Sequence, residues 1–380
     1  MNILYINSNA LSPLSGENIR ANYLIDKLVK EGHRVDLVAP DSNISYEDDK
    51  VNFFPVSRIN RFGKNKELQY LRFGLRCFAL SNKLGRDYDV VYCCGLSGSL
   101  FASRFSRKYN LPVVCEFWET DFPELRSSKN PLVKLLLKLS RGFHRRVMLK
   151  ADKVTLISRE MHDYVYKNLR KDSIVAYDAA DKRYFNEKVK KKHSGFTFSY
   201  HGGILKRDGV LNFLKACDRL AKEHDDFQVM IIGDGPALAE CRYFVDENSQ
   251  LRDKVKFTGW VNYKKIPEYL SMADVGVVPN LLSPINDLVI PRKVFEYMNC
   301  GIPMVVSDLK AVRELFDEDN CCFFVEPADI SGFYDKLKFC MRNKEKLGEA
   351  SHKLLKMSES LNLDSECNKL VKLVEGAAKK

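Results

Sequence analysis

Two charged residues three positions apart, Lys293 and Glu296, stand near the start of the segment PRKVFEYMNCGIPMVVSD (Pro291–Asp308). The segment reads as a helix that stops at a glycine and leads into an apolar strand. A carboxylate near the start of a helix can accept hydrogen bonds from both hydroxyls of a ribose, and a lysine one turn earlier can reach a phosphate. The alternative is a surface ion pair that stabilises the helix by about 0.2–0.5 kcal/mol.

A glycine turn, HGGILKRDG (His201–Gly209), follows an apolar strand-like run. Gly202 and Gly203 allow close approach of the backbone, and Lys206 and Arg207 add positive charge beside it. Backbone donors next to a cation could stabilise a departing diphosphate without a metal. The alternative is a solvated basic turn, and His201 itself is expected to be a packed or hydrogen-bonded residue at the end of a strand.

A second glycine turn, SPLSGEN (Ser12–Asn18), lies between the first expected strand and its helix. Gly16 permits close backbone approach, and the following helix N-terminus offers N–H groups to an anion or a hydroxyl. An ordinary strand–helix turn is the alternative. The segment GDGP (Gly233–Pro236) lacks the third glycine of a dinucleotide fingerprint because Leu238 stands in its place, so no NAD site is expected.

Metal binding is not predicted. The chain has 11 cysteines and no C-x-x-C pair, which favours buried thiols over a zinc site. Asp87 and Asp89 have Asp-x-Asp spacing but precede their strand, and Asp317–Asp319 falls in a late loop. Neither is placed to hold a divalent ion between diphosphate oxygens. We therefore expect no metal and no cofactor.

The elements that must position these residues follow a repeated strand–helix pattern. In the first half, strands are expected at Asn2–Ile6, Arg34–Ala39, Asp89–Gly95, Leu111–Phe117 and Ala151–Ser158. In the second half, they are expected at Phe196–Gly203, Phe227–Gly235, Lys254–Trp260, Asp274–Pro279, Pro303–Ser307 and Cys321–Pro327. Strand–helix–strand units require parallel sheets, so both halves are predicted to be doubly wound α/β domains.

The charged run Glu187–Gly195 between the two halves reads as a linker and hinge. It divides the chain into domains at 1–187 and 196–358, and a last helix at 359–380 could pack back on the first domain. Two facing Rossmann-like domains would place the carboxyl ends of both sheets across a deep interdomain cleft, where open α/β sheets bind ligands.

The amino-acid composition and net charge exclude several classes of protein and suggest what this one binds. The chain has 380 residues, 45% of them hydrophobic, which excludes a disordered or collagen-like protein. It begins without a basic region or a long apolar run, and no stretch approaches a membrane span, so a cytoplasmic protein is expected. Its net charge of +11, from 61 Lys+Arg against 50 Asp+Glu, suggests an acidic substrate, a soluble partner or a membrane surface.

Most of this charge falls in two expected helices, Arg58–Arg86 and Ser127–Lys153. Each pairs an apolar side with basic residues, such as Lys134, Lys138 and Arg141 in the second. Such a stripe could dock on an anionic membrane at about 1 kcal/mol per charge, or could be a solvated face. Nucleic acid is not expected as a partner, because no binding module and no stacking aromatics accompany the charge.

In the order of its motifs the chain resembles glycosyltransferase family 4, retaining enzymes of the GT-B fold, from residue 1 to about 345. The resemblance is carried by MNILYIN with the Gly16 turn, EGHRVDLVAP, ADKVTLIS, YDAADKRYF, YHGGILKRDG, IIGDGP, VKFTGWV, ADVGVVPN and P-x-K-x-x-EYMNCGIPMVVSD. It implies a nucleotide-sugar donor in the second domain, an acceptor mainly in the first, and transfer of the sugar with an α linkage.

The resemblance also implies roles for individual residues. In the donor site, Glu296 would bind the ribose, and Trp260 and Val261 would contact the base. Gly16, Gly202, Gly203, Gly235 and Lys293 would lie around the diphosphate, where Lys206 and Arg207 would be catalytic residues that act on the departing group. In the first domain, Glu119 is the preferred catalytic residue of CEFWETDFPE (Cys115–Glu124). Asp121 is second there, and Asp121, Glu17 and Arg20 would contact the acceptor.

The chain departs from the family at three positions. Leu288 stands eight positions before Glu296, where many members have a second glutamate. Gly203 replaces an arginine, and Asp208 replaces a lysine. Lys206, Arg207 or Lys293 must then neutralise the phosphates. The sequence does not identify the donor sugar.

The sequence thus predicts a glycosyltransferase of surface-glycan assembly that moves a sugar from an NDP-sugar to a glycan or lipid-linked acceptor at the inner membrane face. A UDP-sugar epimerase on a related scaffold would convert the donor with no acceptor present. A non-catalytic nucleotide-sugar sensor would bind the donor without turnover.

Overall fold

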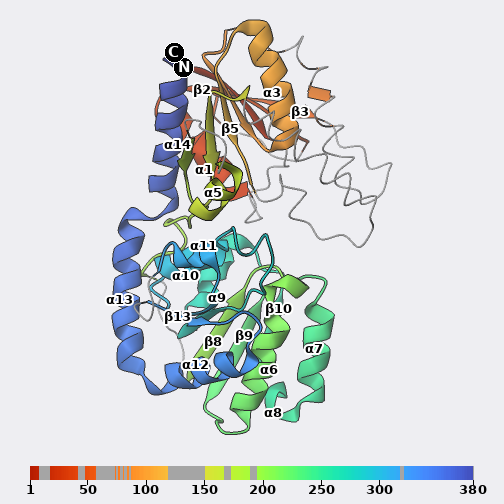
Figure 1. The fold of residues 1–380 in the computed structure, drawn as a ribbon, viewed down its shortest axis with the longest axis vertical. Helices are drawn as coiled ribbons and strands as arrows, with labels where there is room; N and C mark the ends of the chain where they lie inside the picture. The colour runs from red at the N-terminus through yellow and green to blue at the C-terminus, as the bar shows by residue number, and fades with distance from the viewer. Residues whose placement is uncertain are drawn as a thin grey trace. The chain divides into compact units, whose positions relative to one another are not determined.

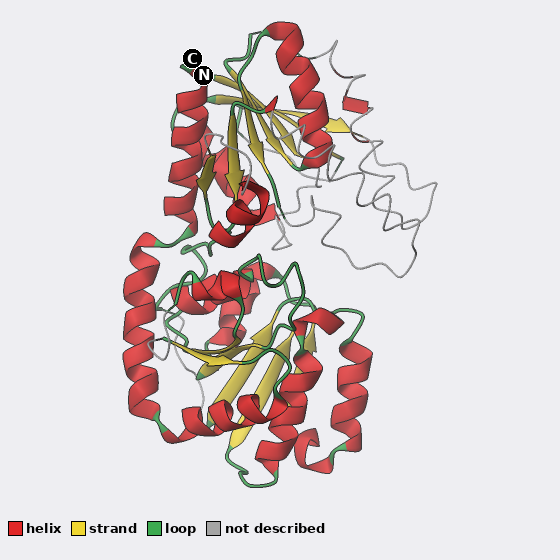
Figure 2. Ribbon diagram, viewed as in Figure 1, coloured by secondary structure: helices red, strands yellow, loops and turns green. Residues whose placement is uncertain are grey.

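The computed structural model describes residues 1–7, 18–41, 48–56, 87–118, 150–166, 173–188, 195–316 and 321–379, with single positions between 73 and 84. The chain forms two compact units, one of residues Met1–Tyr177 with Asp364–Lys380 and one of residues Asp178–Leu363. Figures 1 and 2 show a parallel sheet with flanking helices in each unit. Each unit is a Rossmann-like domain, which confirms the predicted fold class.

In the part of the first unit that the structure describes, seven strands form a parallel sheet in the order β3-β2-β1-β4-β5-β6-β7. Its strands are β1 (Asn2–Asn7), β2 (Arg34–Pro40), β3 (Val51–Val56), β4 (Val90–Cys94), β5 (Val113–Glu116), β6 (Lys153–Leu156) and β7 (Ser173–Val175). Its helices are α1 (Ile19–Lys30), α3 (Leu96–Tyr109), α5 (Arg159–Tyr166) and α14 (Leu363–Ala378). Strands β3 and β7, one at each edge of this sheet, were not predicted from the sequence.

The second unit holds a six-stranded parallel sheet in the order β10-β9-β8-β11-β12-β13. Its strands are β8 (Phe196–His201), β9 (Phe227–Ile232), β10 (Val255–Gly259), β11 (Val275–Val278), β12 (Met304–Ser307) and β13 (Cys322–Val325). Its helices are η4 (Lys206–Asp208), α6 (Val210–Ala221), α7 (Leu238–Glu247), α8 (Ser249–Arg252), η5 (Tyr263–Lys265), α9 (Ile266–Leu270), α10 (Arg292–Asn299), α11 (Lys310–Arg313), α12 (Ile330–Arg342) and α13 (Lys344–Ser360).

A single apolar core joins strands and helices in the second unit. Phe198 of β8 and Val277 of β11 pack with Phe213 of α6 and Leu337 of α12, all of them buried. Because strand residues alternate between the two faces, β8 gives Phe196, Phe198 and Tyr200 to this core. The strands predicted at Phe196–Gly203 and Asp274–Pro279 are therefore interior strands of the sheet, with helices packed over them.

The chain leaves the first unit at Tyr177, before the linker that the sequence predicted at 187–195. The residues after Tyr177 belong to the second unit because their side chains are bonded there: Asp178 pairs with Arg292, and the Phe185 ring lies 5.0 Å from that of Tyr263. The N-terminal domain thus ends earlier than residue 187, the boundary that the sequence predicted.

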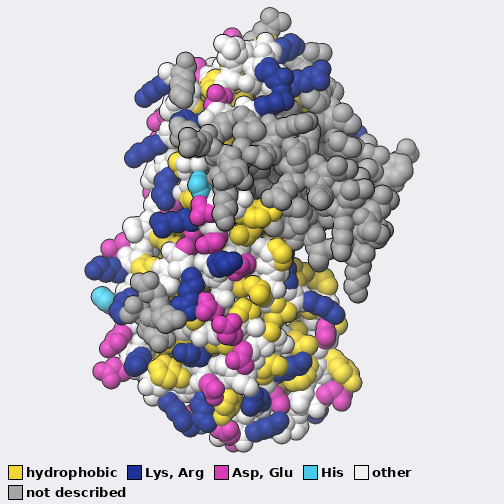
Figure 3. Space-filling model, viewed as in Figure 1, with side chains coloured by type: hydrophobic (Ala, Val, Ile, Leu, Met, Phe, Trp, Pro, Cys, Tyr) yellow, Lys and Arg dark blue, Asp and Glu magenta, His cyan; other side chains and the backbone are white. Residues whose placement is uncertain are grey.

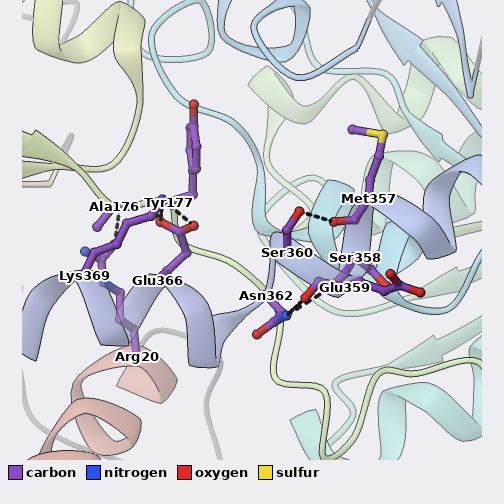
Figure 4. Close-up of polar contacts among 10 residues, drawn as sticks. All are labelled: Arg20, Ala176, Tyr177, Met357, Ser358, Glu359, Ser360, Asn362, Glu366 and Lys369. Carbon is purple, nitrogen blue, oxygen red and sulfur yellow. Dashed lines mark hydrogen bonds and ion pairs between the residues drawn. The ribbon is translucent and has the colours of Figure 1, made fainter.

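The C-terminal helix α14 belongs to the first unit. Its buried Glu366 accepts a hydrogen bond of 2.9 Å from the backbone N–H of Tyr177, and Lys369 bonds the same carboxylate (Figure 4). At the other end of the helix, Glu375 contacts His33 at 3.2 Å.

Figure 4 also shows the end of α13, where the side chain of Asn362 donates to the carbonyls of Ser358 and Glu359.

Candidate functional site

The candidate donor residues of the second unit gather at the carboxyl edge of its sheet. The chain starts this sheet at β8, builds outward through β9 and β10, and then returns to the other side of β8 with β11. The strand order therefore reverses between β8 and β11, and ligands of open α/β sheets bind at such a switch point. The turn after β8 and helix α10 both meet there.

Helix α10 is bonded to three successive residues of β8. The Tyr297 hydroxyl donates to the Ser199 carbonyl at 2.7 Å, and the Lys293 ammonium donates to the Tyr200 hydroxyl at 3.0 Å. The Nε2 atom of His201 lies 2.5 Å from Oε2 of Glu296. These contacts fix the helix along the end of the strand, so Lys293 and Glu296 are held in place before any ligand arrives.

Glu296 is buried, with 4% of the residue exposed. Burial disfavours its charged form, yet the hydrogen bond and charge of His201 and the charge of Arg292 outweigh that effect and hold the pKa of the carboxyl below its usual value. A carboxylate has room for about four hydrogen bonds, so one bond from His201 leaves acceptor capacity for hydroxyls. The residue is therefore an ionised acceptor with a fixed orientation.

Arg292 connects the surroundings of Glu296 with the first residue of the second unit. Its guanidinium pairs with Asp178, the first residue after the crossover. Burial alone would lower the pKa of Arg292, but the charge of Asp178 keeps it raised. Among the described residues, the Nε of Arg292, Oδ1 of Asp178 and Nδ1 of His201 are buried polar atoms without a hydrogen-bond partner. The surroundings of Glu296 are thus polar and only partly satisfied within the unit.

Lys293 lies against the glycine turn. A Cβ atom on Gly202 would come within 3.2 Å of its Cε and 3.4 Å of its Nζ, so the lysine end packs closely on this glycine, whose φ of +118° itself favours glycine. Burial lowers the pKa of Lys293, although the negative charges of Asp208 and Glu296 act to raise it. Lys206, by contrast, has 86% of its side chain exposed and lies 3.8 Å from Glu240, and Arg207 is also exposed.

Gly233 and Gly235 hold the neighbouring turns together. A Cβ atom on Gly233 would lie 1.9 Å from the Gly202 carbonyl oxygen, and one on Gly235 would lie 2.4 Å from that of Ile204. The GDGP segment, weak as a nucleotide motif, therefore brings the turn after β9 against the turn after β8. Gly235, predicted in the donor site, packs on the backbone of this turn.

Trp260 follows β10 at the same edge and is 62% exposed, whereas the neighbouring Val261 is partly buried. An exposed indole at the carboxyl end of a parallel strand could stack on a planar ring. Both residues stand where the sequence expected a contact to the base.

In the first unit, Arg20 does not have the exposed position of a residue that binds an acceptor. It is 1% exposed, pairs with Glu116 at 3.1 Å and donates to the Ala176 carbonyl at 2.7 Å. The Tyr92 hydroxyl donates to the same Glu116 carboxylate. A partner from β5, far along the chain, holds the guanidinium inside, and the acceptor contact expected for Arg20 stays a prediction.

Four other predicted residues, Gly16, Glu17, Glu119 and Asp121, lie outside the described residues. So does most of the two basic segments, 58–86 and 127–153. In Figure 3 the acidic and basic side chains of the second unit are interspersed on the face drawn. The sequence did not assign a site role to Tyr200, Arg292 or Asp178, although Tyr200 stands just before the His-Gly-Gly turn and Asp178 stands in the YDAADKRYF segment.

Comparison with known proteins agrees with this architecture. Residues 15–177 match the family described as Glycosyltransferase Family 4, and residues 195–343 match the family described as Glycosyl transferases group 1. HepE of Anabaena, solved in complex with UDP and glucose, superposes with a TM-score of 0.73 over 98% of this chain and 99% of its own, at 14% identity. These matches define a GT-B glycosyltransferase.

The chain belongs to the glycosyltransferases with family 4 and group 1 domains, and it is a transferase enzyme. It is 23% identical to the putative teichuronic acid biosynthesis glycosyltransferase TuaH of Bacillus subtilis, over 66% of this chain and 71% of that protein. It is 26% identical to an Escherichia coli UDP-Gal:alpha-D-GlcNAc-diphosphoundecaprenol alpha-1,3-galactosyltransferase, over 38% of this chain and 36% of that protein. Among the described residues, no helix is long and apolar enough to cross a membrane.

Proposed function

We propose that this enzyme transfers a sugar from a nucleoside-diphosphate sugar to a glycan or lipid-linked acceptor, with retention of the α configuration, in the synthesis of a surface polysaccharide or glycoconjugate. The observation that carries the proposal is the placement of Lys293 and Glu296 on α10, both bonded to the end of β8 at the switch point of the second sheet. Similarity to TuaH, a putative teichuronic acid biosynthesis glycosyltransferase, and to the diphosphoundecaprenol galactosyltransferase supports this class of product.

In the proposed donor complex, the ribose hydroxyls donate to Glu296, whose ionised state His201 maintains. The base stacks beside Trp260. The diphosphate lies over the Gly202–Gly203 turn, where Lys293 supplies the positive charge. Charge builds on the diphosphate as the bond to the sugar breaks, so this lysine acts mainly on the transition state.

The choice of Lys293 over Lys206 and Arg207 rests on burial. An exposed charge acts through water and is strongly screened, whereas a partly buried charge interacts more strongly with an anion. With the lysine in this position, the proposal requires no metal ion. In the first unit, Glu119 remains the proposed catalytic residue, with Asp121 and Glu17 toward the acceptor.

Calorimetric titration with UDP, GDP and ADP in excess EDTA tests the donor site. We expect one nucleotide to bind without metal, and Glu296→Ala to abolish that binding while the circular dichroism spectrum is unchanged. Unchanged affinity in the variant would contradict the role of Glu296. Incubation with the matching NDP-sugar alone separates the reaction classes, because an epimerase would convert it without an acceptor.

We also propose that the enzyme works at an anionic membrane surface, which suits a lipid-linked acceptor. The support is the basic composition of residues 58–86 and 127–153. Flotation with liposomes that contain anionic lipid is expected to carry the protein at physiological salt. Flotation equal to that with neutral liposomes would remove this part of the proposal.

A further inference from the structure

The phenol of Tyr200 joins the two parts of the proposed diphosphate site. Tyr200 is fully buried at the second-to-last position of β8. Its hydroxyl donates to the Gly203 carbonyl and accepts the 3.0 Å hydrogen bond from Nζ of Lys293. The lysine thereby contacts, through one oxygen atom, the glycine turn over which the diphosphate would lie.

A neutral Tyr200 phenol and a charged Lys293 ammonium can make both of these hydrogen bonds. Burial raises the pKa of the Tyr200 phenol well above its ordinary value, so the hydroxyl keeps its proton. A phenol has one proton to donate and lone pairs to accept, and these match the Gly203 carbonyl and the Lys293 ammonium. The lysine also lies 4.2 Å from the centre of the Tyr200 ring, within the range of a cation–π contact.

The position of Lys293 depends on this contact because a lysine side chain is otherwise flexible. Its four-carbon stem carries considerable rotamer entropy, which is lost when the ammonium is fixed on a ligand. A hydrogen bond and a ring contact to Tyr200 restrict the ammonium before the ligand binds. The exposed Lys206 and Arg207 have no comparable support from a buried group among the contacts of the described residues.

We propose that Tyr200 is a positioning residue for the diphosphate: its hydroxyl holds the Lys293 ammonium against the Gly202–Gly203 turn in the orientation that phosphate oxygens require. The inference rests on the proposed donor site. In that site, Tyr200 would contact Lys293 and not the nucleotide, and it would hold the lysine in position before the nucleotide binds.

Tyr200→Phe tests the inference because it removes the hydroxyl and keeps the buried ring. A matched control is Tyr334→Phe in the same unit, where Lys338 donates to the Tyr334 hydroxyl at 2.8 Å and its ammonium lies 5.2 Å from the centre of that ring. This second tyrosine–lysine pair also contacts Glu223, and none of the three belongs to the proposed site.

The measurement is the calorimetric affinity for the nucleoside diphosphate that the wild type binds and for the corresponding free nucleoside. We expect Tyr200→Phe to weaken the diphosphate about tenfold, the equivalent of one charge-assisted hydrogen bond, and to leave the nucleoside unchanged. Tyr334→Phe should change neither affinity. Lys293→Ala should weaken the diphosphate at least as much, and adding Tyr200→Phe to it should cost nothing more.

Three results would overturn the inference: diphosphate affinity of Tyr200→Phe equal to that of the wild type, equal weakening of nucleoside and diphosphate, or a full additional loss in the double variant. Equal weakening would indicate a merely structural role. Failure of the proposed function gives a different result, because the wild type itself would then bind none of the nucleotides.

Discussion

The Nε2 atom of His201 lies 2.5 Å from Oε2 of Glu296, and both residues are buried. Because a buried carboxylate without a partner is costly, each residue depends on the other for its stability. His201 ends β8, and Glu296 lies in α10, which follows β11. The contact therefore ties two elements on either side of the switch point and fixes the carboxylate proposed to bind ribose.

The first prediction concerns this pair. His201→Ala should lower the free energy of unfolding of the second unit by about 2–4 kcal/mol, from a lost charge-assisted hydrogen bond and a small cavity. A double-mutant cycle with Glu296→Ala should give a coupling energy of about 1–3 kcal/mol, measured by urea unfolding. Additivity within about 0.5 kcal/mol would show that the two side chains do not stabilise each other.

How far the sequence could predict this site is clear from α10. The helical spacing, the glycine stop and the following strand placed Lys293 and Glu296 on one helix at the carboxyl edge, as observed. Their partners could not be found in this way, because Tyr200 and His201 are more than 90 positions away in the chain. Only the pairing of β8 with β11 brings that strand beside the helix.

The second prediction concerns pH. Burial lowers the pKa of Lys293 from the ordinary value of 10.5. Only the protonated lysine attracts a diphosphate, so affinity should be highest below this lowered pKa and fall as the pH rises through it. The fall should therefore occur at a lower pH than for an ordinary lysine.

Calorimetric affinities of the diphosphate from pH 7 upward measure this effect. Lys293→Arg is the control, because arginine stays charged over that range, and its affinity should vary less with pH. A fall of the same size in both proteins would assign the titration to another group.

The third prediction tests the close contact between two turns. Gly233→Ala would place a Cβ atom 1.9 Å from the Gly202 carbonyl oxygen, at a φ of +140°, so the backbone must shift. We expect a loss of about 2–3 kcal/mol and a melting temperature about 5–10 °C lower. Diphosphate affinity should fall as well, because the displaced atom belongs to the turn proposed to bind it.

The matched control is Gly348→Ala in α13, where an added Cβ atom meets nothing within 4 Å. Alanine is favoured over glycine inside a helix by about 0.5–1 kcal/mol, so this variant should melt slightly higher than the wild type. Equal melting temperatures for the Gly233→Ala variant and the wild type would show that the two turns separate without cost.

The fourth prediction uses the two tryptophans, Trp118 in the first unit and Trp260 in the second. Trp260 is exposed at the proposed base site, so a bound nucleotide should quench its fluorescence and protect it from acrylamide. Trp118→Phe isolates this signal. A nucleotide that binds by calorimetry without changing the fluorescence of Trp260 would rule out stacking at this position.

The burial of Arg20 in the first unit could not be predicted from the sequence, for a physical reason. Arg20 lies in the first turn of α1, at the carboxyl edge of the sheet, where a basic residue would usually face solvent and a ligand. Its burial depends on the carboxylate of Glu116 and the carbonyl of Ala176, which are distant in the chain. Helical spacing identifies the side of a helix but not a charged partner inside the fold.

The fifth prediction follows from this buried pair. Arg20→Ala leaves the buried Glu116 carboxyl group without its guanidinium partner, so the first unit should lose about 3–5 kcal/mol of stability. Replacing both residues with apolar ones, as in Arg20→Met with Glu116→Leu, should restore much of that loss, because no charge then remains buried without a partner. Urea unfolding compares the two variants. If Arg20 instead contacted the acceptor, Arg20→Ala would raise the KM for the acceptor without lowering stability, and the double variant would regain nothing.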